Sequence, residues 1–184
     1  MDFAIIDLST LPAAARQQVA QILVDAFAKD WPSAWPSLAE AEAELADFNE
    51  ETLCRVAVRG EQVLGWVGAI PEYDGNVWEL HPLAIAPAHQ RQGIGRALVA
   101  DIEAQVRARG GLVMMLGSDD ESYITSLGGQ DLFPDPLSKL AAIEDRGGHP
   151  FVFYRKLGYS LIGVVPDANG PGKPDILMAK RLAP

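Results

Sequence analysis

The stretch His81–Ile102, HPLAIAPAHQRQGIGRALVADI, decides the fold, because an apolar strand-like segment turns there into a helix. Residues 77–86 form a run typical of a strand, and from Ile94 onward apolar side chains recur at the spacing of a buried helix face. Gly93 and Gly95 lie between the two. Glycines at a helix start let backbone N–H groups converge on an anion, which the helix dipole also attracts. The stretch therefore predicts either an anion-binding loop or a plain strand-to-helix turn.

The residues around these glycines exclude two other phosphate loops. The Gly-Lys-Ser/Thr of a P-loop is missing. The strand-to-glycine spacing and the later acidic residue of a dinucleotide-binding loop do not fit either. Taken alone, the glycine spacing leaves both interpretations open.

Length and composition predict one globular domain over residues 1–184, with 48% hydrophobic and 22% charged residues. The net charge of −10 argues against a nucleic-acid partner and suits a cationic ligand, although acidity also serves solubility. The single cysteine, Cys54, excludes an internal disulfide, and we expect its thiol to be inert. No secretory leader and no membrane-length apolar run is recognised, so we expect a cytoplasmic protein.

The order of predicted elements is strand, two helices, three meandering strands, helix, strand, helix and two strands, an α/β chain with a mixed sheet. Thr10 is the expected cap of the first helix, and Ser37 with Glu40 forms a capping box for the second. A long irregular insertion, 118–148, contains one short helix. The predicted helices cover 12–27, 37–48, 94–109, 136–143 and 150–157, and the strands cover 2–8, 53–58, 62–70, 77–86, 112–116, 159–165 and 175–179.

The loop Gln90–Gly95, QRQGIG, resembles the Gln/Arg-x-x-Gly-x-Gly/Ala signature of the GNAT N-acetyltransferase superfamily. The resemblance implies a mixed, mostly antiparallel central sheet flanked by helices, and acetyl-coenzyme A as co-substrate. It also implies that the end of the preceding strand, at Leu83 and Ile85, binds the pantetheine arm through its backbone. The loop residues that would hold the pyrophosphate are Gln90, Arg91, Gln92, Gly93, Ile94, Gly95 and Arg96.

Three longer segments narrow this resemblance: GAIPEYDGNVWELHPL at 68–83, LGSDDE at 116–121, and HPFVFYRKLGYSLIGVVPDANGPGKPDILMAK at 149–180. They are similar to the chromosomal enterococcal type of aminoglycoside 6'-N-acetyltransferase. The resemblance implies acetyl transfer to an aminoglycoside 6'-amine, antibiotic resistance and a homodimer. The residues before Leu53 share only the general pattern.

Acetyl transfer to an amine requires a base, because an alkyl ammonium must first lose a proton. Glu79 and His81 lie two residues apart on a predicted strand and so share one face. The resemblance makes Glu79 the base, directly or through a water, while His81 is either a participant or a packed imidazole. It also assigns the Leu83 N–H to the developing oxyanion, beside Pro82, which has no N–H to donate. Tyr154 would protonate the departing thiolate, or else fill the core.

Acidic and aromatic side chains are the candidates for binding a cationic acceptor. Glu79, Asp119, Asp120 and Tyr73 are the predicted acceptor-binding residues. Most acids of the second helix are interpreted as a solvated face, and the tryptophans as either pocket wall or core. These side chains are Glu40, Glu42, Glu44, Asp47, Trp31, Trp35 and Trp78.

The sequence contains no metal-ligand spacing and no serine-nucleophile motif. We therefore expect direct attack in a ternary complex. Two alternatives stay open: an N-acetyltransferase for a polyamine, amino sugar or peptide, and a catalytically silent sensor that binds acyl-coenzyme A.

Overall fold

The computed structural model describes residues 2–182. Its contacts divide the chain into two compact units: an N-terminal unit that runs to Met114 and includes Leu182, and a C-terminal unit, Met115–Arg181. The single domain expected over residues 1–184 stays a prediction, and residues 1, 183 and 184 of that range lie outside the described part.

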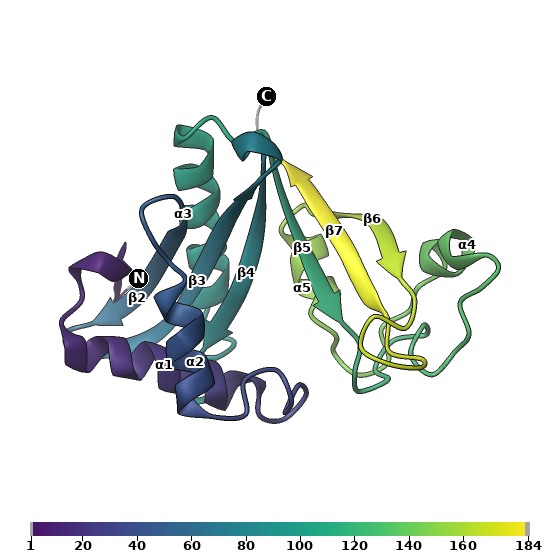
Figure 1. The fold of residues 1–184 in the computed structure, drawn as a ribbon, viewed down its shortest axis with the longest axis horizontal. Coiled ribbons are helices and arrows are strands. Elements are labelled where there is room, and N and C mark those ends of the chain that lie inside the picture. Colours follow the sequence, from purple (N-terminus) through teal and green to yellow (C-terminus); the bar gives the residue numbers. More distant parts are fainter. Residues whose placement is uncertain (1, 183–184) are drawn as a thin grey trace. The chain divides into compact units, whose positions relative to one another are not determined.

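Four antiparallel strands in chain order form the sheet of the N-terminal unit (Figure 1). They are β1 (Ala4–Asp7), β2 (Leu53–Arg59), β3 (Gln62–Glu72) and β4 (Val77–Ile85). The helices are α1 (Ala13–Phe27), α2 (Leu38–Ala46) and α3 (Ile94–Ala108). Three short 3-10 turns connect them: η1 (Leu8–Thr10), η2 (Tyr73–Gly75) and η3 (Pro87–His89).

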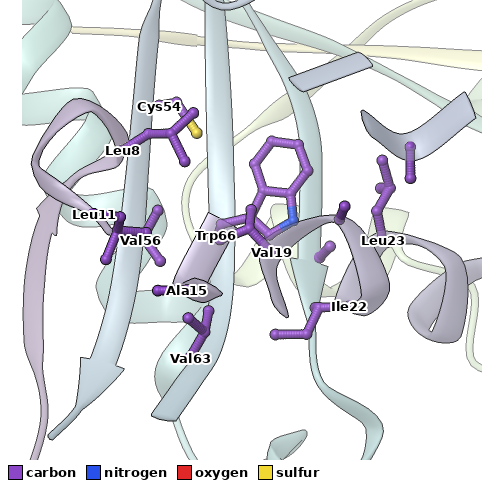
Figure 2. Packing of buried hydrophobic residues seen from close by; sticks show 13 residues of the cluster. Leu8, Leu11, Ala15, Val19, Ile22, Leu23, Cys54, Val56, Val63 and Trp66 are labelled. Atoms are coloured by element: carbon purple, nitrogen blue, oxygen red, sulfur yellow. The ribbon is translucent and has the colours of Figure 1, made fainter. Parts of the chain in front are cut away.

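The two faces of this sheet are covered by different helices, because successive strand residues point to opposite sides. Cys54 and Val56 of β2 pack in the cluster that α1 contributes to. Arg55, between them, points the other way and its Nε lies 2.6 Å from an Asp101 carboxylate oxygen of α3. Figure 2 shows the α1 side, where the Trp66 indole lies beside Val19 of the helix.

The strands β5 (Val113–Asp119), β6 (Ser160–Val165) and β7 (Asp175–Arg181) pair in the order β5–β7–β6. The C-terminal unit contains β5 from Met115 onward, together with β6 and β7. The β6–β7 pair is antiparallel. Two short helices accompany these strands: α4 (Pro136–Ala141), which packs against β6, and α5 (Phe151–Lys156). The predicted α/β class with mostly antiparallel pairing is confirmed.

The expected elements all occur, with differences at their ends. The N-cap of α2 is Ser37, as predicted, with its hydroxyl accepting from the Glu40 N–H at 3.3 Å. The Thr10 cap is wrong: the N-cap of α1 is Pro12, and the Thr10 hydroxyl instead donates to the Asp7 carbonyl, closing η1. The strands β5 and β7 extend further than predicted, to Asp119 and to Arg181.

The insertion at 118–148 is organised around a buried carboxylate. Asp120 is 0% exposed, and its two oxygens accept hydrogen bonds from the Ile124 N–H at 2.8 Å and the Thr125 N–H at 2.9 Å. The Thr125 hydroxyl donates a further bond at 2.6 Å. Thr125 also pairs with Asp145 in an isolated antiparallel bridge. This irregular segment is therefore held by its own polar contacts.

Candidate active site

Glu79 and His81 lie on one face of β4, as their spacing predicted. Both are half-buried, whereas Trp78 and Leu80 between and beside them are buried at 4% exposure. Trp78 belongs to the core, because its indole lies so close to Gly111 that a Cβ on that glycine would contact it. The strand thus presents a carboxylate and an imidazole on the same side, with the buried Trp78 and Leu80 on the other.

A β-bulge follows directly. Leu80 pairs with Ala69 of β3 and Leu83 pairs with Val67, so that His81 and Pro82 stand opposite the single residue Gly68. The extra residue changes the alternation of β4, and a bulge often redirects a side chain beside a functional site. Pro82, which has no N–H to donate, lies within this bulge, directly before Leu83.

His81 contacts α2 and the loop that precedes this helix. Its Nε2 lies 3.5 Å from Oε1 of Glu44, in the last turn of α2, and its ring centroid is 5.7 Å from the Trp35 ring. The Trp35 Nε1–H donates to Oε2 of the same Glu44 at 3.3 Å. Gly68 allows the Phe48 ring and the His81 backbone to approach β3 closely, because a Cβ there would collide with that ring and with the His81 carbonyl.

The glycine loop starts a helix, as predicted. Gly93 is the N-cap of the 15-residue helix α3 and has φ 86°, a left-handed conformation that favours glycine. Arg91 also has a positive φ, 63°. No side-chain cap satisfies the helix start, and the loop side chains are exposed except for Ile94, which is buried at 1%.

Two glutamine side chains brace this loop. Gln90 Nε2 donates to the Ile85 carbonyl at 3.2 Å, and Gln92 Nε2 donates to the Ala88 carbonyl at 3.2 Å. An exposed helix start with uncapped N–H groups, a glycine without a Cβ and arginines on both sides suits a pyrophosphate. The residues present therefore fit the diphosphate of coenzyme A.

Tyr154 lies in α5 of the C-terminal unit, against the rings of Phe153 and Tyr159 at centroid distances of 5.1 and 5.5 Å. Burial raises the pKa of the Tyr154 phenol well above its usual value. The phenol is therefore protonated at neutral pH and has a proton to donate.

Asp119 and Asp120 differ in their surroundings. Asp120 is enclosed by its loop, so its geometry favours a structural role. Asp119 is half-buried, accepts a bond from the Asn169 side-chain amide, and through its backbone carbonyl contacts Nε2 of His149 at 3.1 Å. His149 is 1% exposed, and its Nδ1 accepts the Phe151 N–H at 3.2 Å. His149 therefore links the end of β5 to the start of α5.

Sequence reasoning assigned no specific role to three residues that lie beside these candidates. Glu44 was interpreted as a solvated helix acid, but its carboxylate contacts Trp35 and His81. Trp35, left open as wall or core, lies at His81. His149 carried no signal except its place in the segment 149–180. The remaining predicted acceptor-binding aromatic, Tyr73, is 73% exposed in η2.

Comparison with known protein families shows the class of protein to which the chain belongs. The acetyltransferase (GNAT) family model matches residues 16–124, more than half of the chain, and includes β4, the glycine loop and α3. The chain belongs to the GNAT acetyltransferase family.

Among solved structures, the chain is similar to an aminoglycoside 6'-N-acetyltransferase complexed with coenzyme A, at 36% identity, TM-score 0.89 and 98% coverage of both chains. It is also similar to the aminoglycoside 6'-N-acetyltransferase from Enterococcus faecium, at 35% identity, TM-score 0.86 and 98% coverage of both chains. A third, aminoglycoside 6'-acetyltransferase type Ii, is 31% identical with TM-score 0.72 over 98% of both chains. A comparison with curated protein sequences found no match.

Within residues 2–182, no three His, Cys, Asp or Glu side chains gather so that they could hold a metal ion. Of the helices in the same part of the chain, none has the length and apolar character needed to cross a bilayer.

Proposed function

We propose that this protein is an acetyl-coenzyme A-dependent N-acetyltransferase that acetylates the 6'-amine of aminoglycosides. The observation that carries the proposal is an arrangement within the N-terminal unit. There, an anion-binding helix start follows, after η3 and the glycine loop, a strand that presents Glu79 and His81 on one face. The similarity to three aminoglycoside acetyltransferase structures over 98% of the chain supports this acceptor class.

The co-substrate would be held by the backbone N–H groups of Arg91–Arg96, with Gln90 and Gln92 bracing the loop and the backbone at Leu83 and Ile85 meeting the pantetheine arm. Bound acetyl-coenzyme A supplies an acetyl thioester. Because the Ile85 carbonyl already accepts from Gln90, that glutamine must release it or share it with an incoming N–H donor.

Glu79 is the proposed base: its carboxylate attracts the ammonium group and takes its proton, directly or through a water. The free amine then attacks in a ternary complex, with the Leu83 N–H donating to the oxygen that gains charge. Tyr154 donates its proton to the departing sulfur, and the second proton that the amine loses as the amide forms restores the Tyr154 phenol. Cys54 takes no part, since burial raises the pKa of its thiol and keeps it protonated.

The remaining ammonium groups of the acceptor would be bound by acidic and aromatic side chains. Glu79, Asp119 and the exposed Tyr73 are the proposed contacts. Asp119 is the better candidate of the adjacent pair, because the oxygens of Asp120 already accept three hydrogen bonds within the loop.

The assay is free-thiol release from acetyl-coenzyme A with kanamycin, spermidine and a peptide amine in parallel. We expect turnover with kanamycin at a kcat/KM of about 10⁴ M⁻¹s⁻¹ or more, where ordinary enzyme efficiencies begin. Turnover with only spermidine or the peptide would sink the aminoglycoside proposal. Binding of acetyl-coenzyme A without turnover would instead identify a sensor.

Antibiotic resistance is a further part of the proposal. The cytoplasm is the proposed setting, where a thiol such as Cys54 stays reduced. A susceptible bacterium that expresses the chain should tolerate more kanamycin than one expressing the Glu79→Gln variant. Equal tolerance in the two strains would show that resistance is not its role.

We also propose a homodimer through the edge of the C-terminal unit. β6 pairs only with β7 among the described strands, and its Ile162 and Val165 are 55% and 44% exposed. Leu137 of the adjoining α4 is 64% exposed, and Phe133 just before it is 60% exposed. An unpaired edge with apolar side chains suits a second copy, because antiparallel strand pairing is self-complementary. Light scattering should give twice the chain mass, and Ile162→Lys should give the single mass; a monomeric wild type would contradict the proposal.

A further inference from the structure

The carboxylate of Glu44 has two nitrogen partners, one on each oxygen. Oε2 accepts the Trp35 Nε1–H at 3.3 Å, and Oε1 lies 3.5 Å from Nε2 of His81. The Glu44 side chain is 22% exposed, against 40% for His81. A helix acid on a solvated face would have neither contact.

The other contacts of Trp35 hold this carboxylate in place. Its ring packs edge-on against Phe27 of α1 with centroids 4.7 Å apart, and lies 5.7 Å from the His81 ring at an interplanar angle of 45°. The Ser37 cap fixes the start of α2, two turns before Glu44. Glu44 is thus positioned from α1, from α2 and from the loop that joins them.

An ionised carboxylate only accepts hydrogen bonds. The imidazole nitrogen that faces it must therefore carry a proton, which places the hydrogen of neutral His81 on Nε2 and the lone pair on Nδ1. The same logic governs a buried aspartate that orients a catalytic histidine and selects its tautomer. On β4 itself, the other charged group on this face is Glu79.

We propose that Glu44 is a positioning residue of the acceptor site, which fixes the His81 ring and selects its Nε2–H tautomer. His81 then offers Nδ1 to an N–H of the acceptor amine, beside the Glu79 carboxylate. The idea rests on the proposed acetyl transfer for its catalytic consequence, but the tautomer itself belongs to the free protein.

The direct test is nitrogen NMR of the imidazoles in the free protein. The chain has three histidines, so His81→Asn assigns the signal of interest. We expect His81 of the wild type to be the Nε2–H tautomer, and Glu44→Gln to give a mixture, because an amide oxygen can accept from only one of the two facing nitrogens. Glu42→Gln, an exposed position on the same helix, should leave the His81 signal unchanged. An unchanged signal in Glu44→Gln would overturn the proposal, whether or not any amine is turned over.

Kinetics separate positioning from direct contact with the acceptor. Glu44→Gln should lower kcat about tenfold, less than the roughly 10²-fold that a general base contributes, with the affinity for acetyl-coenzyme A unchanged. In a His81→Asn background the same substitution should have almost no further effect, because neighbouring groups that act as one unit are not additive. A full tenfold effect in that background would mean that Glu44 binds the acceptor itself, and would refute positioning.

A second variant guards against a general folding defect. Trp35→Phe removes the indole N–H and keeps a ring against Phe27, so it should shift the His81 tautomer in the same direction as Glu44→Gln, but less. Retained binding of acetyl-coenzyme A shows that the unit is folded in both variants. If Trp35→Phe leaves the tautomer as in wild type while Glu44→Gln changes it, Glu44 needs no support from Trp35; if neither changes it, the proposal fails.

Discussion

Glu79 and His81 share their face only because β4 alternates regularly up to His81. The bulge at His81–Pro82 changes the alternation immediately afterwards, so that Ala84 and not Leu83 packs in the α1 cluster. The two polar side chains therefore end a regular segment, and the proposed oxyanion donor starts the next. A bulge that places side chain and backbone groups of neighbouring residues in different roles is a common feature of functional strands.

Replacing Glu79 by Gln tests the base. The amide keeps the size of the side chain and cannot take a proton from an ammonium group, so kcat/KM for kanamycin should fall by about 10²-fold or more. Acetyl-coenzyme A affinity, measured by calorimetry, should not change, because the glycine loop is intact. Glu72→Gln, at the end of β3, is the matched control with near wild-type rates. A loss of less than about threefold in Glu79→Gln would move the role of base to another group.

Replacing Tyr154 by Phe tests the acid. The rings of Phe153 and Tyr159 still pack against a phenyl group, so the free energy of unfolding should change little, while kcat should fall about tenfold or more. Tyr159→Phe serves as the comparison, because Tyr159 is buried at 3% beside the same ring and has no proposed role in the reaction. The value of kcat is measured by thiol release. Equal losses of kcat in the two variants would identify Tyr154 as a packing residue.

At this scale, sequence reasoning worked where the relation was local. The shared face of Glu79 and His81 follows from a spacing of two, which any strand imposes. The contact of Glu44 with His81 joins residues 37 positions apart on different elements, and no periodicity encodes it. Asp119 and Asp120 are equivalent in the sequence, and it is the folding of the insertion that buries Asp120.

The elements that carry the site depend on how their ends are capped. Ser37 was predictable because a hydroxyl three residues before a glutamate is a local pattern. Thr10 was not, since the preceding turn η1 uses its hydroxyl and leaves Pro12 at the helix start. For Gly93, the sequence predicted the turn, and the structure adds the left-handed φ of 86° that explains why glycine occupies this position.

Replacing Gly93 by Leu should weaken acetyl-coenzyme A binding at least tenfold, because a side chain would stand where the diphosphate approaches the backbone. Nothing lies within 4 Å of a Cβ at Gly93, so the only cost to folding is the left-handed backbone, about 1–2 kcal/mol. Gly60→Leu is the matched control, since Gly60 also has a positive φ, 58°, and open space, but lies in the β2–β3 turn. Cooperative unfolding with unchanged affinity in Gly93→Leu would show that the loop is only a turn.

His149 makes the link between β5 and α5 sensitive to pH. Burial lowers the pKa of His149 below its ordinary value of 6.5, against the opposing effect of the Asp119 carbonyl and the nearby carboxylates. The unfolded chain then binds a proton more readily than the folded one, so stability from the neutral imidazole is complete above about 6.5 and falls as pH decreases below it. Protonation would also remove the lone pair on Nδ1 that accepts the Phe151 N–H.

Chemical unfolding monitored by fluorescence should therefore give a free energy of unfolding that decreases from about pH 7.5 to about pH 5. A His149→Asn variant should be less stable at the higher pH and lose most of this dependence. His89→Asn, at the half-buried histidine of η3, should keep it. A pH dependence that survives in His149→Asn would assign it to other groups.

The whole molecule carries a net charge of −10, and its proposed acceptor is a polycation. Any carboxylate attracts a cation. An excess of acids over the whole chain also raises the rate of encounter with a cationic acceptor and repels anionic competitors. The same field opposes acetyl-coenzyme A, which is itself anionic. The uncapped start of α3, with Arg91 and Arg96 exposed at it, supplies the local positive charge that overcomes this repulsion. The two substrates are thus expected to respond to salt in opposite directions.

Raising the salt concentration from about 50 mM to about 500 mM shortens the screening length from roughly 14 Å to roughly 4 Å. The kcat/KM for kanamycin should fall several-fold over this range, because attraction to the acidic molecule is screened. The kcat/KM for an acceptor with a single amine should fall much less, and that for acetyl-coenzyme A at saturating kanamycin should stay level or rise. Parallel declines for both substrates would indicate a general effect of salt on the enzyme, and would contradict a role for the molecular charge in acceptor capture.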